Sequence, residues 1–276
     1  MLAKATLAKA SHIWHADDPA LAGTSGECTP SGFAALDAEL PGGGWPHGQL
    51  VELLYDDPGI GELSLLAPAL SAQARAGRTC AWILPCEGEP AQCEPSAQIH
   101  LQRAVPHQRP LPAGEALQRA VPYPPALAEA GIDPSCSIFV RPAVAREAWW
   151  AVEQCLRAAH LGALIGWLPT CGVGADFRAL RRLHLLARRH GALVFALRPS
   201  RCAGAPSPAV LRLQLTCEAE PPRNLAVHIL KRRCRPLIEP VALQVYPWLW
   251  SGASLQSPQA SAVKPWRLAA ALASAG

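Results

Sequence analysis

Short apolar runs alternate with amphipathic segments along most of the chain. Residues 50–54 and 79–84 are typical of buried strands, and 63–76 between them has the length and periodicity of a helix. The same alternation then predicts strands at 137–140, 163–167, 191–197, 210–215, 225–230 and 241–245 and helices at 147–161 and 176–190, the last with Asp176 as N-cap. Runs such as 163–167 are apolar on both faces, as in parallel strands covered by helices. The pattern therefore predicts a doubly wound α/β domain with a mostly parallel central sheet flanked by helices.

Three segments fall outside this alternation. Residues 1–27 have apolar positions at helical spacing up to a proline, and they predict an N-terminal arm with a partner-binding helix. Residues 85–125 hold nine of the 28 prolines and two copies of LQRAVP, so we expect a proline-rich insertion at about 88–122 instead of a helix. We expect a core domain over 28–245 and a C-terminal tail over 246–276.

Composition changes this picture in one respect. Half of the 276 residues are apolar and 17% are charged, which excludes an intrinsically disordered chain. The net charge of +4 is unevenly distributed, because residues 1–100 carry 4 basic and 12 acidic side chains whereas 101–276 carry 21 and 9. The basic half predicts contact with a polyanion or an acidic partner, against the alternative of a solvated surface.

Targeting and metal signals are weak. No apolar stretch reaches the length of a membrane-spanning helix and residues 1–20 lack a signal-peptide core, so we expect a cytoplasmic protein without membrane contact. The ten cysteines form no CxxC pair and lie mostly in apolar segments. We expect buried free thiols and no metal site.

A degenerate phosphate loop follows the strand at 50–54. A functional loop places GxxxxGK[ST] between a strand and a helix, so that backbone N–H groups and a lysine hold the phosphates. Here Gly61 matches the second glycine, but Asp56, Glu62 and Leu63 replace the first glycine, the lysine and the hydroxyl residue. Gly59 and Gly61 also match part of a dinucleotide-binding GxGxxG pattern, which is a much weaker interpretation.

The charges around this loop argue against nucleotide binding. Four acids and no base lie between Glu52 and Glu62, at the place where we expect the triphosphate. Replacing a lysine by a glutamate turns an attraction of several kcal/mol into a repulsion. The strand expected to supply a metal-binding carboxylate ends at Trp167 and Leu168. We therefore predict that ATP binding is lost or very weak, that no cofactor is used, and that no residue is catalytic.

The segment TPSGFAALDAELPGGGWPHGQL, at 29–50, resembles the entry to the core of RecA and RadA proteins. Within that superfamily the chain resembles the ImuA family, which is RecA-like and is sometimes called SulA-like. The residues that carry this resemblance are GFAALDAELPGGGWP (32–46), GIGEL (59–63), YPPALAEAGIDP (123–134), RPS (198–200), SPAVLRL (207–213) and LKRR (230–233).

The resemblance implies a RecA-like P-loop NTPase core with a degenerate nucleotide site. It also implies a function in DNA-damage-induced translesion synthesis, the SOS mutagenesis pathway, and association with the nucleoid when the protein is engaged in repair. The partners would be an ImuB-type polymerase-like protein, an alternative replicative-type DNA polymerase subunit, and RecA itself. The protein would act as a non-catalytic adaptor in protein–protein interactions.

Several basic and aromatic residues are candidates for these contacts. On the helix at 176–190 the apolar stripe leaves its arginines outward, where they would meet DNA, an acidic partner or only solvent. The candidate DNA or partner contacts are Arg178, Arg181, Arg182, Arg198, Arg201, Lys231, Arg232 and Arg233, with weak and non-specific DNA binding expected. The candidate partner-binding residues of the arm are Leu7, Ile13 and Trp14, with folding of the arm onto its own domain as the alternative.

Two other functions stay open on the sequence alone. One is a DNA-dependent ATPase with an unconventional phosphate loop, against which Glu62 counts most strongly. The other is a SulA-like inhibitor of cell division. The sequence does not determine whether the chain oligomerises or which surface meets which partner.

Overall fold

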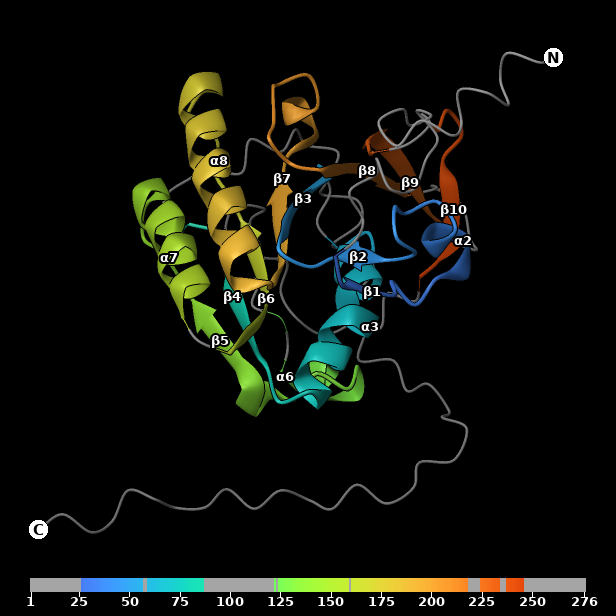
Figure 1. Ribbon diagram of the computed structural model, residues 1–276, viewed down its shortest axis with the longest axis horizontal. Coiled ribbons are helices and arrows are strands. Elements are labelled where there is room, and N and C mark those ends of the chain that lie inside the picture. Colours follow the sequence, from blue (N-terminus) through green and yellow to red (C-terminus); the bar gives the residue numbers. More distant parts are fainter. Residues whose placement is uncertain are drawn as a thin grey trace, which may run out of the picture.

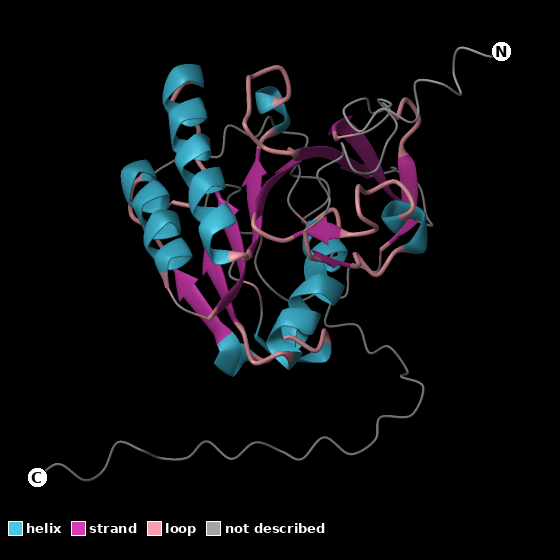
Figure 2. Ribbon diagram, in the orientation of Figure 1, coloured by secondary structure: helices cyan, strands magenta, loops and turns pink. Residues whose placement is uncertain are grey.

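A central sheet of eight strands, with helices on both faces, forms the framework of the structure (Figures 1 and 2). The computed structural model describes residues 26–56, 59–86, 122, 124–158, 160–217, 224–233 and 237–245. The predicted arm, proline-rich insertion and tail fall outside these residues, apart from Gly26, Glu27 and Pro122. The proposed contacts of Leu7, Ile13 and Trp14 therefore stay predictions.

The sheet is mostly parallel. Its strands are β3 (Gln49–Leu54), β4 (Thr79–Ile83), β5 (Ser137–Val140), β6 (Leu161–Trp167), β7 (Leu193–Arg198), β8 (Leu211–Cys217), β9 (Asn224–Lys231) and β10 (Val241–Gln244). They lie in the order β10-β9-β8-β3-β7-β6-β4-β5. All neighbours from β8 to β5 are parallel, and β9 is antiparallel to both β8 and β10. A separate pair, β1 (Cys28–Thr29) and β2 (Trp45–Pro46), is antiparallel.

The helices divide the hydrophobic core into two layers. On one face α3 (Glu62–Arg75) packs with the short α2 (Ala34–Asp37) and α6 (Pro124–Glu129). On the other face α7 (Ala145–Arg157) and α8 (Val173–His190) lie side by side (Figure 1). Side chains alternate between faces along a strand, so Val51 and Leu53 of β3 join the α3 layer while Leu50 joins the α7–α8 layer.

The strand and helix pattern is largely confirmed, with two corrections at helix ends. The helix expected at 147–161 ends at Arg157, because β6 already begins at Leu161 and His160 between them has a positive φ of 66°. The helix expected at 176–190 begins at Val173, so Asp176 is not its N-cap. Its carboxylate instead accepts a hydrogen bond from the Cys171 N–H at 2.8 Å and pairs with a buried arginine described below.

The cysteines of the described residues form no disulfide bonds, as expected. All eight cysteines of the described residues are free, but only Cys80, Cys86 and Cys202 are buried, so the expectation of burial is wrong for the other five, of which Cys171 is exposed. No group of three or more His, Cys, Asp or Glu side chains within the described residues is arranged to hold a metal ion. No helix in this part of the chain is long and apolar enough to cross a membrane.

Candidate functional site

The degenerate phosphate loop lies between the carboxyl end of β3 and the first turn of α3. Gly59 and Gly61 both have positive φ, 85° and 113°, which turns their backbone N–H groups towards the start of the helix. A Cβ atom on Gly61 would lie 2.5 Å from the Cγ2 of Val245, which follows β10. The loop is therefore closely packed at Gly61, where glycine is required both for its φ and for the space available.

The carboxylate of Glu62 accepts hydrogen bonds from the backbone N–H groups of this loop. Its Oε1 and Oε2 accept hydrogen bonds from the Gly59 N–H at 3.0 and 3.1 Å, and Oε2 accepts a third from the Gly61 N–H at 3.2 Å. Glu62 is 1% exposed. Backbone N–H groups at a helix N-terminus are the elements that bind phosphate in a functional loop. In this protein a side chain of the chain itself takes the position of the anion.

Burial and hydrogen bonding oppose each other at Glu62. Removal from water raises the pKa of the Glu62 carboxyl above its ordinary value, whereas the hydrogen bonds from the backbone N–H groups of the loop lower it. Burial is the larger effect, so the net pKa shift is upward. Sequence reasoning expected Glu62 to repel a triphosphate across an open site. In the structure the carboxylate instead folds back onto the loop and accepts hydrogen bonds from its N–H groups.

The other acids near the loop do not form one acidic surface. Asp56 accepts a hydrogen bond from the Ser200 N–H at 2.9 Å, which links the loop to the turn after β7. Glu52 is 0% exposed and lies on the face of β3 that points towards α8, away from the α3 layer. Asp57 lies outside the described residues. The expectation that Glu52 faces a triphosphate is therefore wrong, because alternation along β3 directs it to the opposite face of the sheet.

An aromatic pair occupies the strand ends where a metal-dependent NTPase would place its carboxylate. The Nε1 of Trp167, at the end of β6, donates a hydrogen bond of 2.8 Å to the hydroxyl of Tyr55, which follows β3. Burial raises the pKa of Tyr55 well above its ordinary value, and the nearby charge of Glu62 raises it further. Leu63 and Leu168 are 2% and 3% exposed and belong to the core. These side chains offer a phenol, an indole and leucines in place of metal ligands.

A buried network of four charged side chains lies between the sheet and α8. Arg198 of β7 donates to Glu52 at 3.1 Å and also pairs with Asp176 of α8. Arg212 of β8 donates to Glu52 at 2.7 Å. All four side chains are at least nine-tenths buried. The network balances two positive against two negative charges, as burial of ions requires.

Sequence reasoning missed this network and assigned Arg198 to DNA. The side chain of Arg198 is 1% exposed and already paired, so it is not available to an external phosphate in this structure. For two of its members a signal was present in the sequence, since Glu52 and Arg212 each interrupt an apolar strand. The guanidinium of Arg212 also donates to the carbonyl oxygens of Cys202 and Ala203 at 2.8 and 3.0 Å, which holds the turn after β7 in place.

The remaining basic candidates are distributed over three environments. Arg178, Arg181 and Arg182 are exposed on α8, and Arg182 pairs with Glu153 of α7 at 2.8 Å. Arg201 donates to the Thr170 hydroxyl at 3.2 Å on the carboxyl side of the sheet. The third environment is the end of β9.

The basic cluster at the end of β9 is divided between internal and surface contacts. Lys231 donates to the Ser207 carbonyl at 2.9 Å. Arg232 is largely buried and donates to the carboxylate of Glu39 at 2.7 Å, so its guanidinium serves an internal contact. Arg233 is exposed. Within this cluster, Lys231 and Arg233 remain at the surface.

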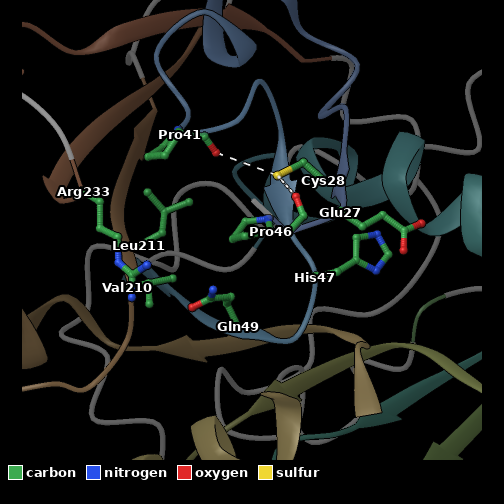
Figure 3. Close-up of a pocket in the computed structure, with 10 residues that line it drawn as sticks. Glu27, Cys28, Pro41, Pro46, His47, Gln49, Val210, Leu211 and Arg233 are labelled. Carbon is green, nitrogen blue, oxygen red and sulfur yellow. Dashed lines mark hydrogen bonds between the residues drawn. The ribbon is translucent and has the colours of Figure 1, made fainter. Parts of the chain in front are cut away.

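Two hollows accompany these elements. One lies near the amino end of β3, where His47, Gln49 and Arg233 surround a volume of about 30 Å³ (Figure 3). That volume suits about one water molecule. The other, about 440 Å³, lies beside α3 and is lined by Phe33, Pro68 and Val245 among others.

No protein-family model matches the chain, and no curated protein is significantly similar to it. The fold and the geometry of the site therefore carry the functional argument, together with the resemblance described above.

Proposed function

We propose that this protein is a RecA-like accessory protein that does not hydrolyse ATP. The finer assignment of the α/β fold to a RecA-like core is supported by the mostly parallel sheet and by the loop at the carboxyl end of β3 that leads into α3. Ligands of open α/β sheets bind at this edge.

The observation that carries the proposal is the hydrogen bonding of Glu62 to the loop N–H groups of Gly59 and Gly61. A triphosphate would have to displace this carboxylate and leave it buried beside the phosphates. Two negative charges at about 4 Å repel each other by roughly 4 kcal/mol at an effective dielectric constant of 20. The Tyr55–Trp167 pair adds to the argument, because it provides no ligand for Mg²⁺ at the end of β6.

The cellular function follows from the resemblance to the ImuA family. We propose that the protein joins an ImuB-type polymerase-like protein and an alternative replicative-type polymerase subunit during damage-induced translesion synthesis, with RecA or DNA as further partners. A DNA-dependent ATPase is the less favoured alternative, because the same Glu62 contacts count against it.

Two measurements test the proposal. Calorimetric titration of the full-length protein with MgATP should give no binding, and co-expression with the polymerase-like partner should give a complex that co-purifies without nucleotide. The Glu62→Gln variant, which keeps the shape of the side chain, should form the same complex. ATP turnover that is stimulated by single-stranded DNA and lost in Glu62→Ala would contradict the absence of hydrolysis. If the polymerase-like partner does not co-purify, the adaptor function is contradicted, but the absence of ATP hydrolysis is not.

A further inference from the structure

The outward surface of α7 and α8 combines arginines with an exposed aromatic ring. On α8, Arg178, Arg181, Arg188 and Arg189 are exposed. On α7, Trp150 is 62% exposed, although tryptophan is highly buried on average. We call the outward surface of these two helices the α7–α8 face. Figure 1 shows the two helices side by side on one face of the sheet.

The two helices run in the same direction, which aligns the ring with the arginines. Helix α7 leads from β5 to β6 and α8 from β6 to β7, and these strands are parallel to one another. The salt bridge between Glu153 and Arg182 places these two residues level with each other. Trp150 lies about one turn before Glu153, and Arg178 lies about one turn before Arg182. Trp150 and Arg178 are therefore at the same height on the α7–α8 face.

The positive charge of this face is poorly balanced. Within the described residues, Arg178, Arg181, Arg188 and Arg189 form no salt bridge with a carboxylate, whereas Glu153 is shared by Arg182 and Arg157. Burial lowers the pKa of His184 of α8, and the charges of Arg188, Arg233 and Lys231 lower it further. The basic end of β9 thus extends the positive field beyond α8.

We propose that the α7–α8 face binds single-stranded nucleic acid. Arg178, Arg181 and Arg188 would contact successive phosphates, because residues at these spacings lie along one side of a helix. Trp150, level with Arg178, would stack on an unpaired base, as aromatic rings do in proteins that bind single strands without sequence preference. A duplex keeps its bases stacked and would gain nothing from Trp150.

An acidic protein is the other polyanion that this face could attract, but the geometry favours nucleic acid. A row of arginines that recurs along α8 matches a polymer with regularly repeated charge. The proposal rests on the α7–α8 face alone and does not depend on the phosphate loop or on the adaptor function.

Fluorescence anisotropy of a labelled oligothymidylate with the full-length protein tests this proposal. Wild-type binding should weaken steeply between about 50 and 200 mM salt, and Arg181→Ala and Arg188→Ala should each reduce the slope of log K against log salt by about 0.7. Trp150→Ala should weaken single-strand binding at least about fivefold, since stacking contributes about 1–3 kcal/mol per base. Its binding to a duplex of the same length should be unchanged, and Trp150→Phe should retain most of the single-strand affinity.

Arg75→Ala provides a matched control, because Arg75 is exposed at the end of α3 on the other face of the sheet. It should bind the oligonucleotide like the wild type. The proposal is overturned if the wild type does not bind, or if the α8 variants and Trp150→Ala bind as the wild type does. It is also overturned if polyglutamate competes as effectively as unlabelled oligothymidylate and Trp150→Ala has no effect, because the face would then suit an acidic protein.

Discussion

The indole Nε1 of Trp167 donates a hydrogen bond to the hydroxyl of Tyr55, and this bond joins the carboxyl ends of β6 and β3 across 2.8 Å. Strand β7 lies between these two strands in the sheet. The pair therefore lies at the edge of the sheet where open α/β folds bind their ligands. Together with Glu62, it fills this edge with side chains of the protein itself.

A double-mutant cycle on this pair should measure its contribution. Trp167→Phe and Tyr55→Phe each remove one partner, and Trp167→Phe leaves a buried hydroxyl without its donor. We expect each single variant to lose about 1–2 kcal/mol in the free energy of unfolding and the pair to be coupled by about 1 kcal/mol. Urea unfolding checks this prediction. Additive single effects would show that the hydrogen bond contributes nothing.

Glu62→Ala should expose an anion site. The Gly59 and Gly61 N–H groups would lose their acceptor, at a cost of about 1–3 kcal/mol in the free energy of unfolding. Inorganic phosphate should restore part of this loss in the variant and should stabilise the wild type less, because the carboxylate blocks the same donors. Thermal unfolding with increasing phosphate measures both effects. Equal stabilisation of the two proteins would contradict occupancy of the loop by Glu62.

The stability of the protein should depend on pH through Glu62. Because the folded-state pKa of Glu62 is raised above its ordinary value of 4.5, the folded protein binds the proton more tightly than the unfolded chain. The contribution of Glu62 is therefore largest below pH 4.5 and declines as pH rises through the folded-state pKa. Glu62→Gln should remove this decline. Urea unfolding of both proteins from about pH 4.5 to 7 should show the variant gaining stability relative to the wild type. A constant difference would count against a raised pKa.

Arg198→Ala should be among the most destabilising single changes. It leaves Glu52 and Asp176 buried with less positive charge, and breaking a buried pair typically costs about 3–5 kcal/mol. Arg178→Ala, on the exposed surface of α8, is the matched control and should change the free energy of unfolding by about 0.5 kcal/mol or less. Chemical denaturation compares the two variants. Similar stabilities would refute a structural role for the network.

The elements of the fold were largely predictable because they depend on local pattern. All eight strands of the sheet and the helices α3, α7 and α8 follow from apolar runs and periodicity, with errors confined to the ends of these elements. At the start of α8 the error had a specific cause. Asp176 is a common N-cap residue type, but its carboxylate is used by Arg198, which is 22 positions away in sequence.

The candidate site was only partly predictable. The replacement of the loop lysine by Glu62 was visible, but whether this carboxylate would repel a ligand across an open loop or fold back onto the loop N–H groups depends on the φ angles of Gly59 and Gly61. The roles of Arg198 and Arg232 were not predictable, because basic residues after strands are usually exposed. Both are instead used in contacts between distant segments.

The sequence alone determined the alternation of strands and helices, the loss of the phosphate-loop lysine and hydroxyl, and the concentration of arginine in the later half. These are properties of residue type and spacing along one segment. The tertiary structure decided which charges are internal and which remain at the surface. The pairing of Glu52 with Arg198 and Arg212 requires three strands to be neighbours, and the alignment of Trp150 with Arg178 requires two helices to run in parallel. Such relationships depend on long-range packing, which residue spacing along the chain does not specify.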